Sequence, residues 1–343
     1  MDKFTIGLDL AKNVFQVHVV DATGKLVTAR QLRRNQVEDF FRKLPPSMVG
    51  MEACGTAHHW ARRLISLGHE VRLLPPTAVK PYVKPGKKND AADAAAICEV
   101  VTRPHIHAVP VKTVDQQALL VLHRSRSLLV EQRTALSNAL RAHLAEFGIV
   151  AAKGMAKVAD LVAVLDSETS GIPAIARQAL ALIGNQIDEC NARIDAIEGN
   201  IAAWHKTNET SRNLATIPGI GVLTASAIAA TVPDAAGFKS GRDFSAWLGL
   251  VPRQNSSGGK DRLGRITKAG DRYIRQLLVL GATVVIFHTG KKGASGWLSN
   301  LLARKPKKLA AVALANKMAR IAWAVMTRGE VYSAPAAPQA AAA

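Results

Sequence analysis

The sequence predicts an α/β layered domain followed by a mostly helical region. Two features support this fold class. Residues 4–74 contain several short β-rich segments with a helix between two of them, which is typical of a mixed sheet covered by helices. The rest of the chain contains long segments whose apolar residues recur every three or four positions, as they do in amphipathic helices.

The β-rich segments follow one another from the N-terminus. FTIGLDLAKNVFQVHVVDATGKLV alternates apolar and polar residues and turns at DATGK, so we expect a hairpin of adjacent strands. A short apolar strand in SMVGMEACGT ends at Glu52, and a helix is expected at about 56–67. The next strand, HEVRLLPP, is stopped by two prolines.

Two long helices are expected in the middle of the chain. Residues 113–147 contain no Gly or Pro, and their apolar spacing predicts a helix on the order of 50 Å long. A second helix starts at Pro173 and carries Ile187, Ile194, Ile197 and Ile201 in near-heptad spacing. This pattern fits a packed pair within one chain and an oligomer interface equally well.

The last third contains shorter helical runs. In TSRNLATIPGIGVLTASAIAATV a Pro-Gly-Ile-Gly turn separates two of them, which is the arrangement of a helix-hairpin-helix, so the amides at Gly219 and Gly221 are candidates for binding a phosphate. Ordinary corners between helices use glycine as well. A Lys-rich helix follows in ARKPKKLAAVALANKMARIAWAVMTRG, and the low-complexity ending is expected to be disordered.

The charge of the chain indicates a polyanionic partner. Lys and Arg outnumber Asp and Glu by 45 to 26, for a net charge of +19. Residues 1–112 carry +7, residues 113–207 carry −1 and residues 208–343 carry +13. Three widely spaced cysteines argue against a disulfide framework and indicate a reducing, cytosolic setting. We expect no signal peptide and no membrane partner, because no segment approaches about 20 uninterrupted apolar residues.

Four acidic residues stand out against this basic background. Asp90 and Asp93 lie three apart and project from one helix face, and taken alone they are better explained by helix capping, with Asn89 or Asp90 at the N-cap and Asp93 in the first turn. Asp9 lies within an apolar strand, where a carboxylate is costly unless it is paired or bound to a metal, and Glu52 ends a strand at a sheet edge. Together the four would form an oxygen-rich site for Mg²⁺.

A second candidate site lies in QNSSGGKDRLGRITKAG. Ser256 and Ser257 precede two glycines, and basic residues surround them. From its chemistry alone, this segment could be a loop that binds a phosphate through backbone amides and cations. We expect several basic residues to contact nucleic acid. Two of them, Lys87 and Lys88, precede Asp90, and the others lie in or beside the serine segment: Arg253, Lys260, Arg262, Arg265 and Lys268.

IGLDLAKN, GMEACGT and KKNDAADAAA, with their four acids in this order, resemble the DEDD transposases of bacterial insertion sequences, in the family numbered one hundred and ten that is related to the Piv pilin-gene invertase. IPGIG followed by FSAWLGLVPRQNSSGG resembles the C-terminal domain of that family. The resemblance implies a RuvC-like, ribonuclease-H-type domain over 1–112, a coiled-coil region over 113–207, a mostly helical transposase domain over 208–330 and a tail over 331–343.

The resemblance also implies an activity. Asp9, Glu52, Asp90 and Asp93 would bind Mg²⁺, and Ser257, or Ser256 beside it, would attack DNA to form a phosphoserine intermediate. A non-coding guide RNA, a homo-oligomer (dimer or tetramer) and a bacterial cytoplasmic location on DNA are implied as well. Two alternatives stay open: a metal-dependent nuclease of the junction-resolvase type without a covalent serine intermediate, and an architectural DNA-binding protein without catalysis.

Overall fold

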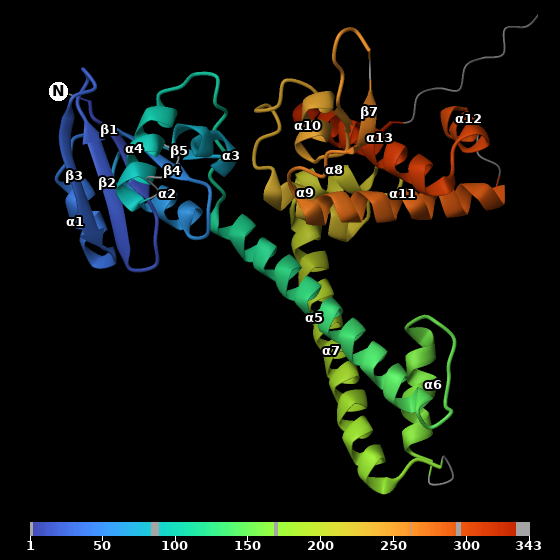
Figure 1. Ribbon diagram of the computed structural model, residues 1–343. Helices are drawn as coiled ribbons and strands as arrows, with labels where there is room; N and C mark the ends of the chain where they lie inside the picture. Colours follow the sequence, from blue (N-terminus) through green and yellow to red (C-terminus); the bar gives the residue numbers. More distant parts are fainter. Residues whose placement is uncertain (1–2, 84–88, 168–170, 261, 293–295, 334–343) are drawn as a thin grey trace, which may run out of the picture. The chain divides into compact units, whose positions relative to one another are not determined.

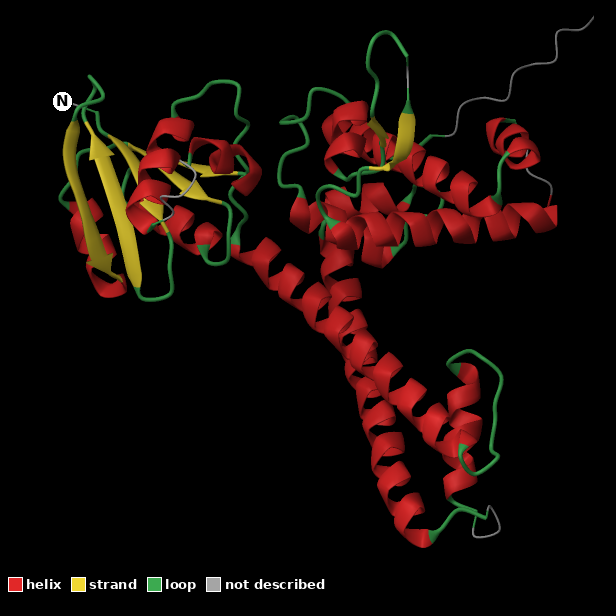
Figure 2. Ribbon diagram, viewed as in Figure 1, coloured by secondary structure: helices red, strands yellow, loops and turns green. Residues whose placement is uncertain are grey.

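Figure 1 shows the computed structural model, which describes residues 3–83, 89–167, 171–260, 262–292 and 296–333. The chain forms two compact units. The first unit comprises Met1–Gln116 with Val232–Gly237, and the second comprises Gln117–Thr231 with Phe238–Ala343. The first is a mixed α/β unit and the second is mostly helical, so the predicted fold class is confirmed at this level (Figure 2).

A five-stranded mixed sheet forms the centre of the first unit. The strands run in the order β3 (Leu26–Arg33), β2 (Val14–Val20), β1 (Thr5–Asp9), β4 (Met48–Glu52) and β5 (Glu70–Leu74). β1, β2 and β3 are antiparallel neighbours, whereas β4 and β5 continue the sheet parallel to β1. The strands that the sequence predicted are therefore confirmed.

Helices cover both faces of this sheet. Successive side chains on a strand point to opposite faces, so Ile6 and Leu8 of β1 share one face. They pack there in a buried core with Phe41 of α1 (Val37–Arg42) and Trp60 of α2 (Ala57–Ser66). The short helices η1 (Arg34–Gln36), α3 (Pro76–Val79) and η2 (Lys80–Tyr82) complete the connections.

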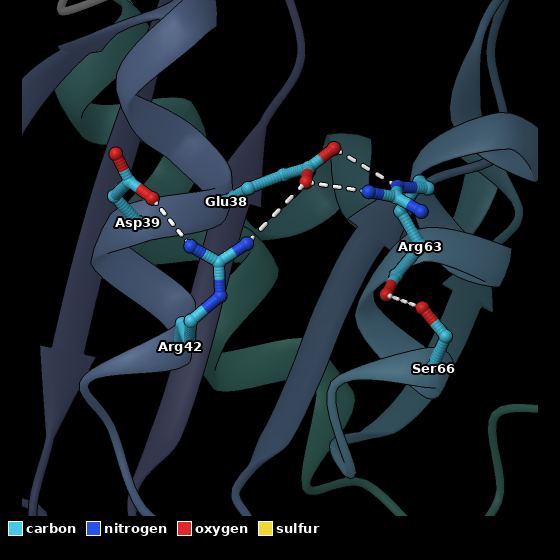
Figure 3. Close-up of polar contacts among 5 residues, drawn as sticks. All are labelled: Glu38, Asp39, Arg42, Arg63 and Ser66. Atoms are coloured by element: carbon cyan, nitrogen blue, oxygen red, sulfur yellow. Dashed lines mark hydrogen bonds and ion pairs between the residues drawn. The ribbon is translucent and has the colours of Figure 1, made fainter.

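An ion-pair cluster on the surface joins α1 to α2 (Figure 3). The Glu38 carboxylate accepts hydrogen bonds from Arg63 Nε at 2.9 Å and Nη2 at 2.6 Å. Arg42 lies 3.9 Å from the same carboxylate and donates to Asp39 at 2.6 Å. Such exposed pairs add little free energy of folding, and this one links the surfaces of α1 and α2 on one face of the sheet.

Helix α4 (Asp90–Val101) covers the opposite face. It lies so close to the sheet that a Cβ added to Gly7 would be 2.0 Å from the carbonyl oxygen of Ala94. A Cβ added to Gly50 would be 2.8 Å from the Cβ of Val101. Gly7 and Gly50 are directly opposite each other on β1 and β4. This glycine pair forms the flat surface on which α4 rests.

Two long antiparallel helices, α5 (Val114–Ala145) and α7 (Ala174–Thr207), extend through the second unit. The bond from Arg133 to Asn191 (2.9 Å) and the ion pair of Arg126 with Glu198 (2.6 Å) join them, and their residue numbers change in opposite directions. Buried residues of α7 include Leu180, Ile187, Ile194 and Ile201, one heptad apart. Helix α6 (Ala156–Leu165), which the sequence analysis did not predict, packs against both long helices at their far end.

The remaining helices and a small hairpin form the body of the second unit. They are α8 (Glu209–Ala215), α9 (Val222–Thr231), α10 (Gly241–Trp247), β6 (Pro252–Gln254), β7 (Leu263–Ile266), α11 (Arg272–Lys292), α12 (Trp297–Arg304) and α13 (Lys307–Arg328). Among the described residues, α13 alone is long and apolar enough to cross a membrane. Its buried face, which includes Ala311, Ala315 and Ala319, packs against α10 and α11.

Candidate active site

The acidic cluster (Asp9, Glu52, Asp90 and Asp93) is assembled at one edge of the sheet. Asp9 and Glu52 are the last residues of the parallel strands β1 and β4, whose register places Leu8 opposite Met51. Each acid lies two residues after the glycine that faces α4, so the strand alternation directs both carboxylates to the α4 side. The sheet thus positions two of the four acids together.

Helix α4 supplies the other two acids. Asn89 caps it, and the Asn89 side chain accepts a hydrogen bond from the amide of Ala92 at 2.8 Å. Asp90 and Asp93 lie in the first turn. Because Gly7 and Gly50 allow α4 to approach the sheet closely, this turn reaches the edge where β1 and β4 end. The capping expected from the sequence is therefore present, and it coexists with the acidic cluster.

The pKa of Asp9 reflects the three other carboxylates near it. Burial raises it, and the negative charges of Asp93, Asp90 and Glu52 raise it further, to about 6, while the backbone amide of Leu10 opposes the shift. Burial, Glu52 and Asp9 likewise raise the pKa of the nearby Cys54 thiol, so this thiol stays protonated at neutral pH. The edge of the sheet is a region of concentrated negative charge.

The donor set of the acidic cluster fits Mg²⁺. All four side chains offer hard carboxylate oxygens, and a divalent cation would relieve the repulsion that raises the pKa of Asp9. Among the described residues, no three or more His, Cys, Asp or Glu side chains lie close enough together to hold a metal ion by themselves. Since Mg²⁺ usually retains several waters and few protein ligands, an open cluster of this kind still suits it.

Ser257 lies at the tip of a β-hairpin rather than in an irregular loop. Strands β6 and β7 pair antiparallel, and the Ser257 carbonyl accepts a hydrogen bond from the Lys260 amide at 3.1 Å. The two residues between them, Gly258 and Gly259, have φ of +55° and +75°. Positive φ at both central positions defines a two-residue hairpin turn that favours glycine. The glycine pair was the sequence signal for this turn.

The two adjacent serines have different surroundings. The Ser256 hydroxyl accepts a hydrogen bond from the Arg262 amide at 3.2 Å across the hairpin. The Ser257 side chain is exposed, and its hydroxyl makes no hydrogen bond to any other residue that the structure describes. Both serines are exposed, so the two differ in hydrogen bonding among the described residues and not in exposure.

The base of the hairpin is tightly fixed. A Cβ added to Gly249 would lie 2.3 Å from the Ala269 carbonyl oxygen, and one added to Gly270 would lie 1.9 Å from that of Trp247. The Arg275 guanidinium donates to the carbonyl of Leu248 at 2.9 Å and to that of Ala269 at 2.7 Å. The sequence analysis missed Arg275, because its partners are backbone carbonyls that become neighbours in the folded chain.

The predicted nucleic-acid contacts lie in several environments. On or beside the hairpin, exposed positions are occupied by Arg253, Lys260, Arg262, Arg265 and Lys268. Gly219 (φ +88°) packs against α11 and α13, where a Cβ would lie 2.8 Å from Val285 and 2.9 Å from Met318, and Gly221 is exposed just before α9. Lys87, Lys88 and most of the tail expected to be disordered lie outside the described residues.

Two transposase family models match separate parts of the chain. Residues 6–149 match the DEDD transposase model of IS110 elements, and residues 211–296 match the model described as "Transposase IS116/IS110/IS902 family". The first match includes the acidic cluster and the second includes the hairpin.

Two of the relatives described next span almost the whole chain, and a third spans about a third of it. It is 50% identical over 336 residues to a "Probable family 20 transposase" of Pseudomonas aeruginosa, covering 97% of this chain and 99% of that protein. It is 40% identical over 332 residues to the "Transposase for insertion sequence element IS1328" of Yersinia enterocolitica, covering 96% and 98%. A "Pilin gene-inverting protein" of Moraxella bovis is 28% identical over 128 residues, covering 36% and 39%. The chain therefore belongs to the IS116/IS110/IS902 family of transposases.

Proposed function

We propose that this protein moves its own insertion sequence as a DNA recombinase, with Ser257 as the nucleophile and the acidic cluster as a Mg²⁺ site acting on the same phosphodiester. The observation that carries this proposal is the fixed β6–β7 hairpin, which presents the Ser257 hydroxyl at its exposed tip.

In the proposed reaction the Ser257 oxygen attacks the phosphorus of a DNA phosphodiester. An Oγ–P bond forms while one P–O bond of the DNA backbone breaks, and the released strand hydroxyl gains the proton that Ser257 loses. Attack by another strand hydroxyl reverses these steps, rejoins DNA and restores the serine. When bound by Asp9, Glu52, Asp90 and Asp93, Mg²⁺ would stabilise the charge that develops on the phosphoryl oxygens. Arg253, Lys260 and Arg262 would hold the DNA backbone beside the serine.

The proposal extends to the domains and partners. The first unit would be a RuvC-like domain within 1–112, and α5 with α7 a coiled coil within 113–207 that joins copies into a dimer or tetramer. Residues 208–330 would form the transposase domain. The partners would be DNA and a non-coding guide RNA in the bacterial cytoplasm. The net charge of +19 and its concentration at residues 208–343 support polyanionic partners.

A covalent adduct tests the reaction. Purified protein is incubated with Mg²⁺, the RNA flanking the element, and labelled donor and target DNA, then denatured and separated by gel electrophoresis. We expect a protein–DNA adduct that Ser257→Ala abolishes and that the matched Ser256→Ala variant retains. Asp9→Asn should abolish both cleavage and adduct. Cleavage without an adduct would instead establish the nuclease alternative, and activity that survives Asp9→Asn would refute a catalytic acidic cluster.

A further inference from the structure

A groove of about 970 Å³ lies in the second unit beside the serine hairpin. Strand β7, the start of α10, the start of α12 and one face of α13 line it. Its notable side chains are two indoles and four cations: Trp297, Trp323, Arg242, Arg265, Lys317 and Arg320. Among the described residues that line it, none is Asp or Glu. We call this site the tryptophan groove.

The aromatic and cationic groups of the groove are already combined. Trp297 is 44% exposed although it is a large apolar residue, and the Lys317 ammonium lies 4.7 Å from the centre of its ring. Arg242, Lys317 and Arg320 are exposed. An indole beside cations offers a ligand a stacking surface and a positive charge within one site.

The floor of the groove is connected to the serine hairpin. Gly264, Arg265 and Ile266 of β7 line it directly. Asn316 of α13 donates hydrogen bonds to the Leu250 carbonyl at 3.2 Å and to the Ser245 hydroxyl at 3.4 Å. These bonds attach α13 to the segment that leads into β6. A strand held in the groove would therefore be held against the element that carries Ser257.

We propose that the tryptophan groove binds an unpaired stretch of DNA strand, with a base stacked on indole and the flanking phosphates on the four cations. This inference rests on the proposed function, since it assigns a binding site to DNA that the recombinase opens. Bases stack on aromatic side chains only when they leave the duplex stack, and cations neutralise the backbone. An apolar peptide would leave four cations without partners, which makes it the poorer occupant.

The composition of the chain concealed this groove. Aromatic residues make up only 5% of the sequence, which gave no sign of a stacking surface. The two indoles are 26 positions apart in sequence, on α12 and α13, and only the packing of these helices brings both to one cavity.

Fluorescence anisotropy of labelled 12-mers tests the proposal on the full-length protein without Mg²⁺. The probes are a thymidine DNA 12-mer and an abasic DNA 12-mer of equal charge. Loss of one stacked base is expected to weaken binding about fivefold to a hundredfold. Trp297→Ala should remove the preference for thymidine and leave abasic binding unchanged. Lys317→Gln should weaken both DNA probes more than Lys308→Gln, a matched change on α13 outside the groove.

Three results would overturn the proposal: equal affinity for the thymidine and abasic probes, a Trp297→Ala variant that keeps the preference, or tighter binding of a uridine RNA 12-mer than of the thymidine DNA 12-mer. Ser257→Ala serves as the separating control, because it should not change binding of any probe. A missing adduct with the thymidine preference intact would count against the serine mechanism alone. A normal adduct without the preference would count against the groove alone.

Discussion

At the scale of single residues, the most informative side chain is Asp9, because its carboxylate is partly buried and three other carboxylates surround it. Its pKa of about 6 in the folded protein lies above the ordinary value of 3.8. The folded state therefore binds this proton more tightly than the unfolded state does. The contribution of protonated Asp9 to the stability of the folded state is complete below about pH 4 and is lost as the pH rises through 6.

The raised pKa of Asp9 predicts how the Asp9→Asn substitution changes the stability of the metal-free protein. At pH 7.5 the variant should have a higher free energy of unfolding than the wild type, by about 1 to 2 kcal/mol when solvent screening is included. Near pH 4 the difference should disappear. Urea unfolding at the two pH values measures this, and a difference independent of pH would contradict it. Mg²⁺ should stabilise the wild type more than the variant.

At the scale of secondary-structure elements, α4 depends on the glycines beneath it. Gly7→Ala would place a methyl group against the Ala94 carbonyl and push the first turn of α4 away from β1 and β4. We expect a loss of about 1 to 3 kcal/mol of stability from overpacking, together with weaker Mg²⁺ binding. Gly55→Ala is the matched control, because no described atom lies within 4 Å of its added Cβ. Calorimetry with and without Mg²⁺ distinguishes the two variants.

A second element-scale feature is a buried polar chain that joins α5, α9 and α11. His123, which is 2% exposed, lies 3.0 Å from the Tyr273 hydroxyl and 3.1 Å from that of Ser226. The Ser226 hydroxyl donates to the Val222 carbonyl at 2.7 Å, so it accepts from the imidazole N–H, and Tyr273 donates to the other ring nitrogen. In this neutral tautomer both ring nitrogens of His123 have a hydrogen-bond partner inside the protein.

The pKa of His123 gives this chain a pH dependence. Burial is the larger cause and the Arg126 charge the smaller one, and together they lower the pKa of His123 to about 4. The stabilisation is complete above pH 6.5 and is lost as the pH falls towards 4. We expect the second unit to lose about 2 to 3 kcal/mol between pH 7 and pH 4.5 through this residue. His123→Gln, which keeps hydrogen-bonding groups but does not titrate, should show a smaller loss in urea unfolding, and an identical loss would refute the assignment.

The sequence predicted the elements whose pattern is long or apolar. The alternation of β1 and β2 and the three-to-four spacing of α5 and α7 sufficed, because burial of one face dictates these periods. The β6–β7 hairpin was missed as a hairpin, since its strands are short and exposed and carry no apolar alternation. The contact of α4 with Gly7 and Gly50, and the meeting of Trp297 with Trp323, arise from packing between distant segments and leave no local signal.

At the scale of the whole molecule, the distribution of charge determines how binding responds to salt. Residues 208–343 carry +13 of the net +19, and Arg253, Arg262 and Arg265 belong to this part. We expect binding of duplex DNA to fall steeply between 50 and 200 mM salt, by about 10³-fold or more if six phosphates are contacted. Replacing these three arginines by Gln should reduce the slope of log affinity against log salt by up to about 3. Lys25→Gln, on an exposed turn of the first unit, should change it little.

The length of the hairpin that carries Ser257 determines how far this serine stands from the rest of the second unit. Its base is fixed by Gly249, Gly270 and Arg275, so the height of the tip above that base is set by the number of residues in β6 and β7. Two residues added to each strand would raise the serine by roughly 7 Å and keep its orientation, whereas one residue added to each would turn it to the opposite side. The length of the hairpin would thus set the position of the serine, and the spacing between the cut positions on DNA should change with that length.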